Sequence, residues 1–208
     1  MSDTYLTIEA IGEGLYKEKM SRFISFAVPV VTVDEALACV ERYRKEYYDA
    51  RHVCWAYMIG ADRKCFRSND NGEPSGTAGK PILGQINSAG LTDILVVVIR
   101  YFGGIKLGTG GLIVAYRTEA IAASKVVERL IEDCVKIRFE YPLMNEVMRI
   151  VKEEQAAVVS QSFEMDCEMT LRLRRMAMPR LRERLENVRG VTLTEAGVTD
   201  DSDVPDAL

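Results

Sequence analysis

An uninterrupted apolar stretch runs from Ile94 to Ile99 and predicts a strand that is buried on both faces. The stretch ends in Arg100-Tyr101-Phe102, and glycines then recur as far as Gly111. A helical pattern follows the glycines, and we expect this helix to span residues 111–129. The pattern therefore predicts a strand that carries a cation and two aromatic rings to a glycine-rich loop at one end of a sheet.

The rest of the first 130 residues alternates between short strand and helix patterns. Thr32 and Glu35 form a capping box that predicts a helix extending to about residue 48. Strands are expected at 5–10, 21–28, 53–59 and 64–68, and a turn at Gly12 and Gly14. A loop is expected over 69–79, with a short helix that begins at Thr77 or Lys80 and ends at Ser88. These elements predict an α+β domain with a mixed sheet.

A second series of strand and helix patterns begins near residues 129–132. Strands are expected at 135–141, 157–165, 167–174 and 191–198, with helices opened by Pro142 and Pro179. The order βαββαβ is that of a ferredoxin-like domain. We therefore predict a first domain over 1–130, a ferredoxin-like domain over 131–199 and an acidic, disordered tail over 200–208.

Composition narrows the class of protein. The chain has 208 residues, of which 48% are hydrophobic, and a net charge of −4, so any nucleic-acid binding must use a local basic patch. There is no apolar run of membrane-spanning length, and the first residues do not resemble a signal peptide. The five cysteines are scattered without a CxxC motif. We expect a cytoplasmic protein without disulfides and without membrane contact.

The glycine-rich loop matches neither common nucleotide-binding motif. Thr109 stands where a Walker A loop needs lysine, and Ile113 stands at the third glycine position of a dinucleotide fingerprint. One interpretation is that the glycines only make tight turns. The other is an anion site of backbone N–H groups and cations, formed by Arg100, Lys106, Thr109, Gly103, Gly104, Gly108 and Gly110.

The loop before the short helix offers a second group of polar side chains, namely Asp70, Glu73, Ser75, Thr77 and Lys80. It is either a surface loop closed by its own side-chain hydrogen bonds or a supporting wall of the same anion site. Nearness in sequence does not decide whether the two loops meet in space.

Metal and nucleophilic chemistry have little support in the sequence. His52 is the only histidine, so a histidine cluster is impossible. His52 and Cys54 share one face of a strand and could form a catalytic dyad or a purely structural pair. Without a clear base and nucleophile, we expect no catalytic residue, no metal and no cofactor.

The second domain carries several arginines. Arg172 and Arg174 share one face of a strand, and Arg180 and Arg184 share one face of a helix. These four residues are candidates for a face that follows an RNA backbone. The alternative is a solvated surface paired with Glu168, Glu183 and Glu186.

Two segments, DNGEPSGTAGKPIL and RYFGGIKLGTGGL, resemble the signature of the IMPACT family, which includes the bacterial YigZ-type proteins. The resemblance implies that the first domain shares the fold of RNase PH and of domain IV of elongation factor G. It implies that the second resembles the last domain of that factor, and that His52 lies near the loop face. The chain departs from the family pattern at Val114, which replaces an arginine, and at Arg117, which replaces a glycine and offers its charge on a neighbouring helical face.

These observations support three hypotheses about function. The leading one is a non-enzymatic protein linked to translation regulation, which contacts RNA, the ribosome or another phosphate-bearing ligand through Arg100, Lys106, Lys80 and Arg117. The second is an enzyme acting on a phosphorylated or nucleotide substrate in the same cleft. The third is an interaction regulator that binds another regulatory protein. Steep salt dependence favours the first hypothesis, and ligand-induced thermal stabilisation without RNA affinity favours the second.

Overall fold

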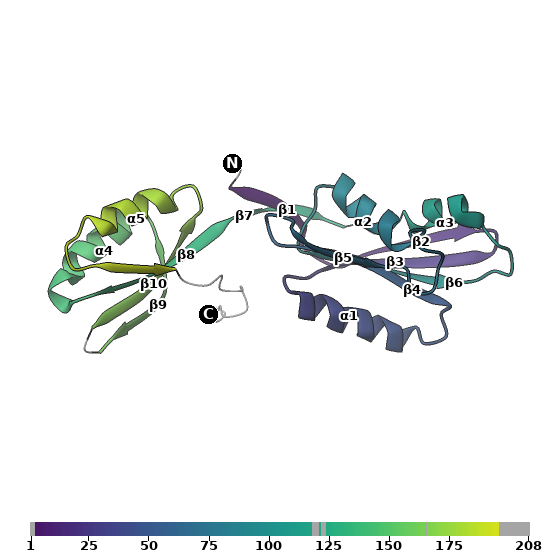
Figure 1. Ribbon diagram of the computed structural model, residues 1–208, viewed down its shortest axis with the longest axis horizontal. Helices are drawn as coiled ribbons and strands as arrows, with labels where there is room; N and C mark the ends of the chain where they lie inside the picture. The colour runs from purple at the N-terminus through teal and green to yellow at the C-terminus, as the bar shows by residue number, and fades with distance from the viewer. Residues whose placement is uncertain (1–2, 118–120, 122–123, 165, 196–208) are drawn as a thin grey trace. The chain divides into compact units, whose positions relative to one another are not determined.

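The computed structural model describes residues 3–117, 121, 124–164 and 166–195. The chain divides into two compact α/β units. The first spans Thr4–Arg129, and the second begins at Leu130 and also includes Asp3 (Figure 1). Each unit has its own hydrophobic core, and each is described separately below. No helix among the described residues is long and apolar enough to span a membrane.

The first unit is built on a five-stranded antiparallel sheet with the strand order β2-β3-β6-β4-β5. Its elements are β1 (Thr4–Ile8), β2 (Gly12–Glu18), β3 (Ser21–Pro29), α1 (Val33–Glu46), β4 (His52–Ile59), β5 (Cys65–Asn69), α2 (Gly79–Ser88), β6 (Ile94–Tyr101), α3 (Gly108–Tyr116) and β7 (Val126–Leu130). The apolar stretch predicted as a buried strand is β6, which lies at the centre of the sheet.

The two faces of β6 contribute to two different cores. Val96 and Val98 pack with residues of α2 and α3, whereas Val97 and Ile99 pack with residues of α1. Figure 1 shows α1 on one side of the sheet and α2 and α3 on the other. Because helices cover both faces of the strand, its residues are all apolar and do not alternate between apolar and polar.

Three predictions for this unit were wrong. A mixed sheet was expected, but every pairing in the five-stranded sheet is antiparallel, since periodicity gives no strand direction. Residues 12–18 form β2, not a turn; Gly12 pairs with Ala27 of β3, and the turn lies at residues 19–20. The helix predicted over 111–129 ends at Tyr116, and Val126–Leu130 is instead a strand that pairs with β1. The partner strand lies more than 100 residues earlier, so local periodicity cannot reveal the pairing. Residues 118–120, 122 and 123 lie outside the described residues.

The second unit has the predicted βαββαβ order. Its elements are β8 (Glu132–Phe139), a 3₁₀ turn (Tyr141–Leu143), α4 (Met144–Glu153), β9 (Ala157–Phe163), β10 (Cys167–Arg174), α5 (Met178–Glu186) and β11 (Thr192–Glu195). The four strands form a sheet in the order β11-β8-β10-β9. Alternate residues of β8 and β10 pack with apolar residues of α4 and α5 in one core. The predicted acidic tail over 200–208 lies outside the described residues.

Candidate functional site

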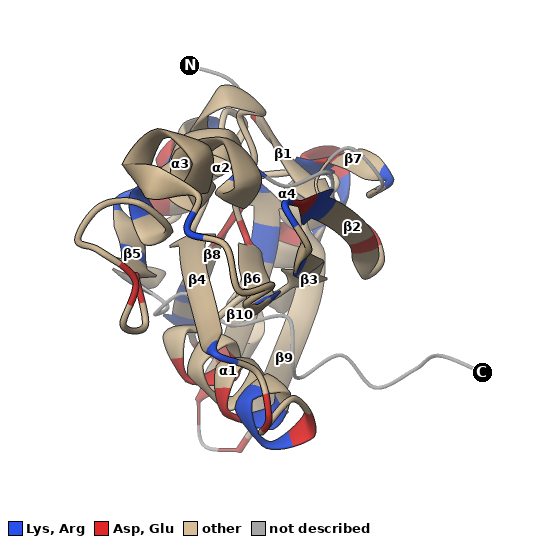
Figure 2. Cartoon of the chain, turned by 90° about the vertical axis from the view of Figure 1, so that its right-hand side faces the viewer, with Lys and Arg blue, Asp and Glu red and all other residues tan. Residues whose placement is uncertain are grey.

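Arg100 lies near the end of the central strand, between two neighbouring strands of the sheet. It is opposite Phe23 of β3 and opposite His52 of β4. Its side chain is on the α2 and α3 side of the sheet, because it alternates with Ile99, which packs on the α1 side. Figure 2 looks onto this end of the sheet, with α2 and α3 on one side of it and α1 on the other.

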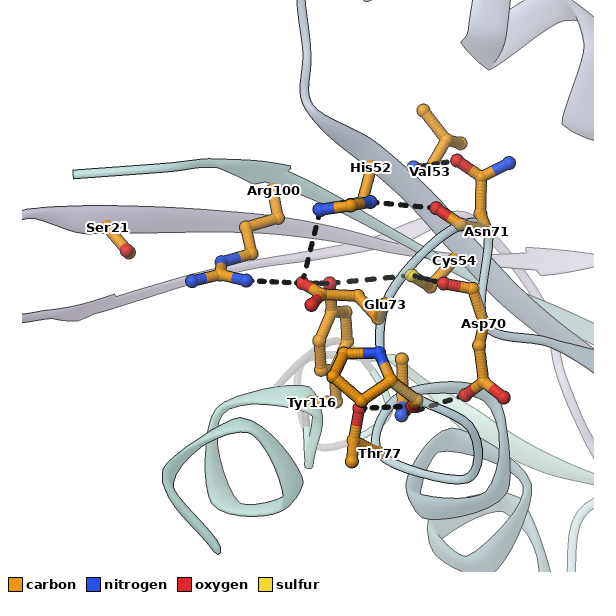
Figure 3. A network of polar contacts seen from close by, with 12 residues as sticks. Ser21, His52, Val53, Cys54, Asp70, Asn71, Glu73, Thr77, Arg100 and Tyr116 are labelled. Atoms are coloured by element: carbon orange, nitrogen blue, oxygen red, sulfur yellow. Dashed lines mark hydrogen bonds and ion pairs between the residues drawn. The ribbon is translucent and has the colours of Figure 1, made fainter. Parts of the chain in front are cut away.

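Glu73 is the centre of a buried polar network at this position (Figure 3). Arg100 Nη1 donates to Glu73 Oε1 over 2.5 Å, and the Tyr116 hydroxyl donates to the same oxygen over 2.8 Å. His52 Nε2 lies 3.8 Å from this oxygen. The side chains of Glu73 and Arg100 are only 4% and 6% exposed. The loop at 70–80 and the segment at 100–117, whose meeting the sequence leaves open, therefore meet at Glu73.

His52 and Cys54 belong to this network but do not form a dyad. His52 Nδ1 lies 2.8 Å from the carbonyl oxygen of Asn71, which can only accept, so Nδ1 carries a proton. The Cys54 thiol donates to the carbonyl oxygen of Asp70 over 3.0 Å and contacts the Tyr116 hydroxyl at 3.4 Å. Burial raises the pKa of Cys54 to about 12, and burial also raises the pKa of Tyr116. Both groups are therefore protonated at neutral pH and act as hydrogen-bond donors.

Asp70 accepts hydrogen bonds from backbone N–H groups at the start of α2. Its carboxylate accepts the backbone N–H groups of Gly76, Ala78 and Gly79 over 2.8, 3.0 and 2.8 Å. Burial alone would raise the pKa of Asp70, but these three donors and the charge of Lys80 outweigh burial and lower it. The carboxylate takes the place that an anion would occupy at this helix start.

The remainder of the 70–80 loop is also held by internal bonds. The Thr77 hydroxyl donates to the carbonyl oxygen of Pro74 over 2.7 Å, and Asn71 Oδ1 accepts the N–H of Val53 over 2.9 Å. Ser75 and Lys80 are exposed. Asp70, Glu73 and Thr77 thus hold the loop together, while Ser75 and Lys80 remain available to a partner.

The glycine-rich loop is fixed to the sheet at one end and open at the other. A Cβ at Gly103 would lie 2.1 Å from the carbonyl carbon of Met20, so only glycine fits against the β2–β3 turn. The Gly103 N–H also donates to Ser21 Oγ over 3.1 Å. Gly104 and Gly108 have φ values of +85° and +74°, which side chains rarely adopt. The glycines therefore serve turns and close approach up to the start of α3.

The first turn of α3 lacks a cap. Its N-cap residue, Leu107, makes no side-chain hydrogen bond to the turn, no side chain among the described residues is seen to accept its N–H groups, and its first turn contains no acidic residue. Thr109 and Gly110 are exposed there, as is Lys106 just before the helix. A Cβ at Gly110 would meet nothing within 4 Å. Uncapped N–H groups with space in front of them are a favourable site for an anion.

The predicted phosphate ligands do not all lie at this turn. Arg100 is buried and paired with Glu73, and Arg117 is the C-terminal cap of α3. A helix of nine residues is about 13 Å long, so Arg117 is separated from the first turn by that length. Lys106, Thr109, Gly108 and Gly110 are the predicted residues that the fold brings together.

Comparison with known proteins decides the family. The model of the Impact N-terminal domain matches residues 19–124. The IMPACT family member YvyE of Bacillus subtilis is 38% identical over 158 residues, which cover 74% of this chain and 73% of that protein. This chain belongs to the IMPACT family.

A second relative is similar in sequence, and a solved structure is similar in fold. YigZ of Escherichia coli is 50% identical over 100 residues, which are 47% of this chain and 49% of that protein. A crystal structure described as that of a hypothetical protein superposes with a TM-score of 0.73 at 29% identity. The superposition covers 96% of this chain and all of the other. The solved protein therefore contains both units of the fold.

The four arginines predicted as one RNA face of this IMPACT protein lie on two sides of the second unit. Arg172 and Arg174 alternate with buried Leu171 and Leu173, so they are on the sheet face away from the helices. Arg180 and Arg184 are on α5, which covers the other face. Three of the four are ion-paired: Arg172 with Glu132, Arg180 with Glu154, and Arg184 with Glu153 and Glu154. The glutamates differ from those expected, and the arginines do not make one surface.

The sequence reasoning missed Tyr116 as a member of the network. Its signal is weak, because it is one tyrosine at the end of a helix that consists otherwise of Thr109 and of small and apolar residues. A buried hydroxyl needs a partner, and Glu73 supplies it. Among the described residues, no group of three or more His, Cys, Asp and Glu side chains is placed to hold a metal ion.

Proposed function

We propose that this IMPACT protein is a non-enzymatic binding protein linked to translation regulation, and that it holds a phosphate group of RNA or the ribosome at the first turn of α3. The ligand contacts are the N–H groups of Gly108, Thr109 and Gly110, the Thr109 hydroxyl and the Lys106 ammonium group. A regulatory protein that carries a phosphate group is a partner of the same chemical kind.

Gly110 is the observation that carries the proposal. A glycine within a helix costs about 1 kcal/mol relative to alanine. Gly110 has neither a positive φ nor a neighbour that would exclude a Cβ. Close approach of a ligand to the backbone is a physical reason for a glycine at such a position. The other two α-helices of this unit have their first turns satisfied by Thr32 and by Asp70.

The buried network supports this turn instead of performing chemistry. Arg100 and Tyr116 meet at Glu73, so the strand before the loop and the helix after it are joined by one carboxylate. Cys54 has a thiol whose pKa is raised to about 12, which does not suit a nucleophile at neutral pH. These features favour binding over the enzyme hypothesis.

The link to translation is the expectation attached to the family and to its domain folds. We propose that the first unit is like RNase PH and domain IV of elongation factor G, and that the second is like the last domain of that factor. Both folds recur in translation factors, which makes this argument one of fold analogy. The direct support remains the geometry of the α3 turn.

Ribosome co-sedimentation at about 50 mM and about 200 mM salt tests the proposal, because phosphate contacts are lost steeply with salt. The variants are Lys106→Gln at the start of α3 and Arg117→Gln at its end, which remove the same charge from opposite ends of one helix. We expect salt-sensitive pelleting that Lys106→Gln weakens and Arg117→Gln leaves nearly unchanged. Absence of pelleting by the native protein at both salt concentrations, or equal effects of the two variants, would contradict the proposal.

A further inference from the structure

A row of three side chains crosses the end of the sheet on the side of α1. Lys17 of β2 is paired directly opposite Arg22 of β3, and Arg22 is paired opposite Tyr101 of β6. Residues that are directly opposite in an antiparallel sheet point to the same face. A shallow hollow of about 350 Å³ opens here, lined by Lys17, Met20, Ser21, Arg22 and Tyr101.

The two cations face each other without a carboxylate between them. Like charges directly opposite in a sheet are unfavourable. Neither Lys17 nor Arg22 forms an ion pair with any carboxylate in the described part of the chain. Glu18 accepts the Tyr16 hydroxyl over 3.1 Å and Asp49 accepts the Tyr101 hydroxyl over 2.8 Å, so these two carboxylates are bonded to tyrosines and not to the two cations. The hollow therefore holds two cations that have no ion-pair partner among the described residues.

Arg22 is held in place by an aromatic ring. Its guanidinium carbon lies 4.5 Å from the centroid of the Tyr101 ring, a cation–π contact that leaves the planar N–H groups free to bind at their edges. Arginine presented in this way matches the oxygens of a phosphate group. A positioned arginine also loses less conformational entropy when it binds.

The turn beside the hollow has a conformation that its residues do not favour. Lys19 and Met20 have φ values of 45° and 65°, in a two-residue turn where asparagine and glycine are the usual residues. Met20 is 82% exposed and contributes to the hollow. Bulky residues in the left-handed region occur preferentially at functional positions. Here the turn places the apolar side chain of Met20 in the lining of the hollow.

We infer that this hollow is a second phosphate-binding site, in which Lys17 and Arg22 hold the phosphate and Met20 contacts the attached sugar or base. It lies on the opposite sheet face from Arg100, and it does not depend on binding at α3. The shared chemistry is a phosphate group, whose source is an RNA chain or a small phosphorylated molecule.

The test compares two variants that each remove two positive charges. Lys17→Gln with Arg22→Gln removes the hollow's cations, and Lys64→Gln with Lys152→Gln removes two exposed cations elsewhere. Binding of a labelled 20-nucleotide oligouridylate is measured at several salt concentrations, and binding of inorganic phosphate and of polyglutamate is measured in parallel. Urea unfolding checks that each variant folds, and Lys17→Gln alone, which leaves the Arg22–Tyr101 contact intact, provides a second variant of the hollow.

We expect the hollow variant to bind the oligouridylate at least ten-fold more weakly at low salt than the native protein, with a salt slope shallower by about 1.4, the value for two contacts with single strands. Lys17→Gln alone should give about half of that change in slope. The control pair should change affinity by less than three-fold. A selective loss of inorganic phosphate binding would also support the site and would identify a small phosphate ligand as its source.

Two results would overturn the inference. One is an equal loss of oligouridylate binding in the hollow and control variants. The other is a larger loss for polyglutamate than for oligouridylate, which would indicate an acidic protein partner. The variant Gly110→Ala, measured alongside, separates the two proposals: a loss only in Gly110→Ala refutes the hollow and leaves the α3 site standing, and a loss only in the hollow variant does the reverse.

Discussion

Arg100 Nη1 donates a 2.5 Å hydrogen bond to Glu73 Oε1, and both side chains are almost completely buried. The pair joins the end of the central strand to the polar loop before α2. A buried charge is tolerated only with a partner, so each residue depends on the other. Arg100 Nε is buried and has no hydrogen-bond partner in the part of the chain that the structure describes, which makes the Glu73 contact more important.

Removing one member of this pair should be strongly destabilising. We expect Glu73→Ala to lower the free energy of unfolding by about 3–5 kcal/mol, because it leaves a buried guanidinium without its counter-charge. Glu73→Gln with Arg100→Met should cost less than the sum of the single changes. Urea unfolding measures both quantities. The exposed pair of Asp62 and Lys64 is the control, and Asp62→Asn should cost no more than about 1 kcal/mol. Similar costs for Glu73→Ala and Asp62→Asn would show that the buried pair has no special role.

The Cys54 thiol should destabilise the fold at alkaline pH. Its pKa is raised by burial from an ordinary value near 9 to about 12, so between these values the unfolded chain loses the proton and the folded chain keeps it. Stability is therefore complete below pH 9 and declines above it, by at most about 1.4 kcal/mol per pH unit from this group. Unfolding measured from pH 8 to 11 should show a shallower decline in Cys54→Ala. An identical slope in both proteins would contradict this assignment.

Cysteine labelling tests the same environment. Cys65 is exposed and Cys54 is buried. With iodoacetamide at pH 8, we expect Cys65 to be modified rapidly and Cys54 only at the rate of opening of the fold. Peptide mass spectrometry over time distinguishes the two sites. Rapid modification of Cys54 in the folded protein would show that the network is open to solvent.

The Asp70 carboxylate should stabilise the folded state at neutral pH and lose this effect in acid. Its lowered pKa means that the folded state keeps the carboxylate charged to lower pH than the unfolded chain does. Its contribution is present above the unfolded pKa, near 4, and is lost as the pH falls through the folded value. Asp70→Ala should cost about 1–2 kcal/mol at pH 7, the cost of a lost helix cap. The stability of Asp70→Asn should depend less on pH between 5 and 2.5 than that of the native protein. If the native protein and Asp70→Asn lost stability in parallel, the capping role would be wrong.

Local sequence patterns were sufficient to predict β6 and the order of elements in the second unit. A fully apolar run between turn residues marks a buried strand, and strict alternation in 167–174 marks a half-exposed one. The same reasoning failed at residues 12–18, because Gly12 and Gly14 look like turn residues until β3 is present to pair with them. It also failed at Val126–Leu130, whose partner strand begins at Thr4.

The site could be predicted only in part. Glu73 and Arg100 were both candidates, but their pairing depends on a loop conformation that the sequence does not encode locally. Arg100 was expected to face a ligand, whereas the buried position at the end of β6 commits it to Glu73. Lys106, Thr109 and Gly110 were expected in a loop before a helix beginning at residue 111, whereas α3 begins at Gly108 and takes Thr109 and Gly110 into its first turn. Glycines favour a loop in a local pattern, so the pattern placed the helix start three residues too late.

The most direct measurement compares Gly110→Ala in α3 with Gly84→Ala in the middle of α2. Neither added Cβ meets an atom within 4 Å, so each change should stabilise its helix by about 0.5–1 kcal/mol. Only Gly110 lies where N–H groups are open to a ligand, so Gly110→Ala should weaken salt-sensitive ribosome or oligouridylate binding by about ten-fold while Gly84→Ala leaves it unchanged. Equal affinity of both variants and the native protein would show that the first turn of α3 is not the binding site.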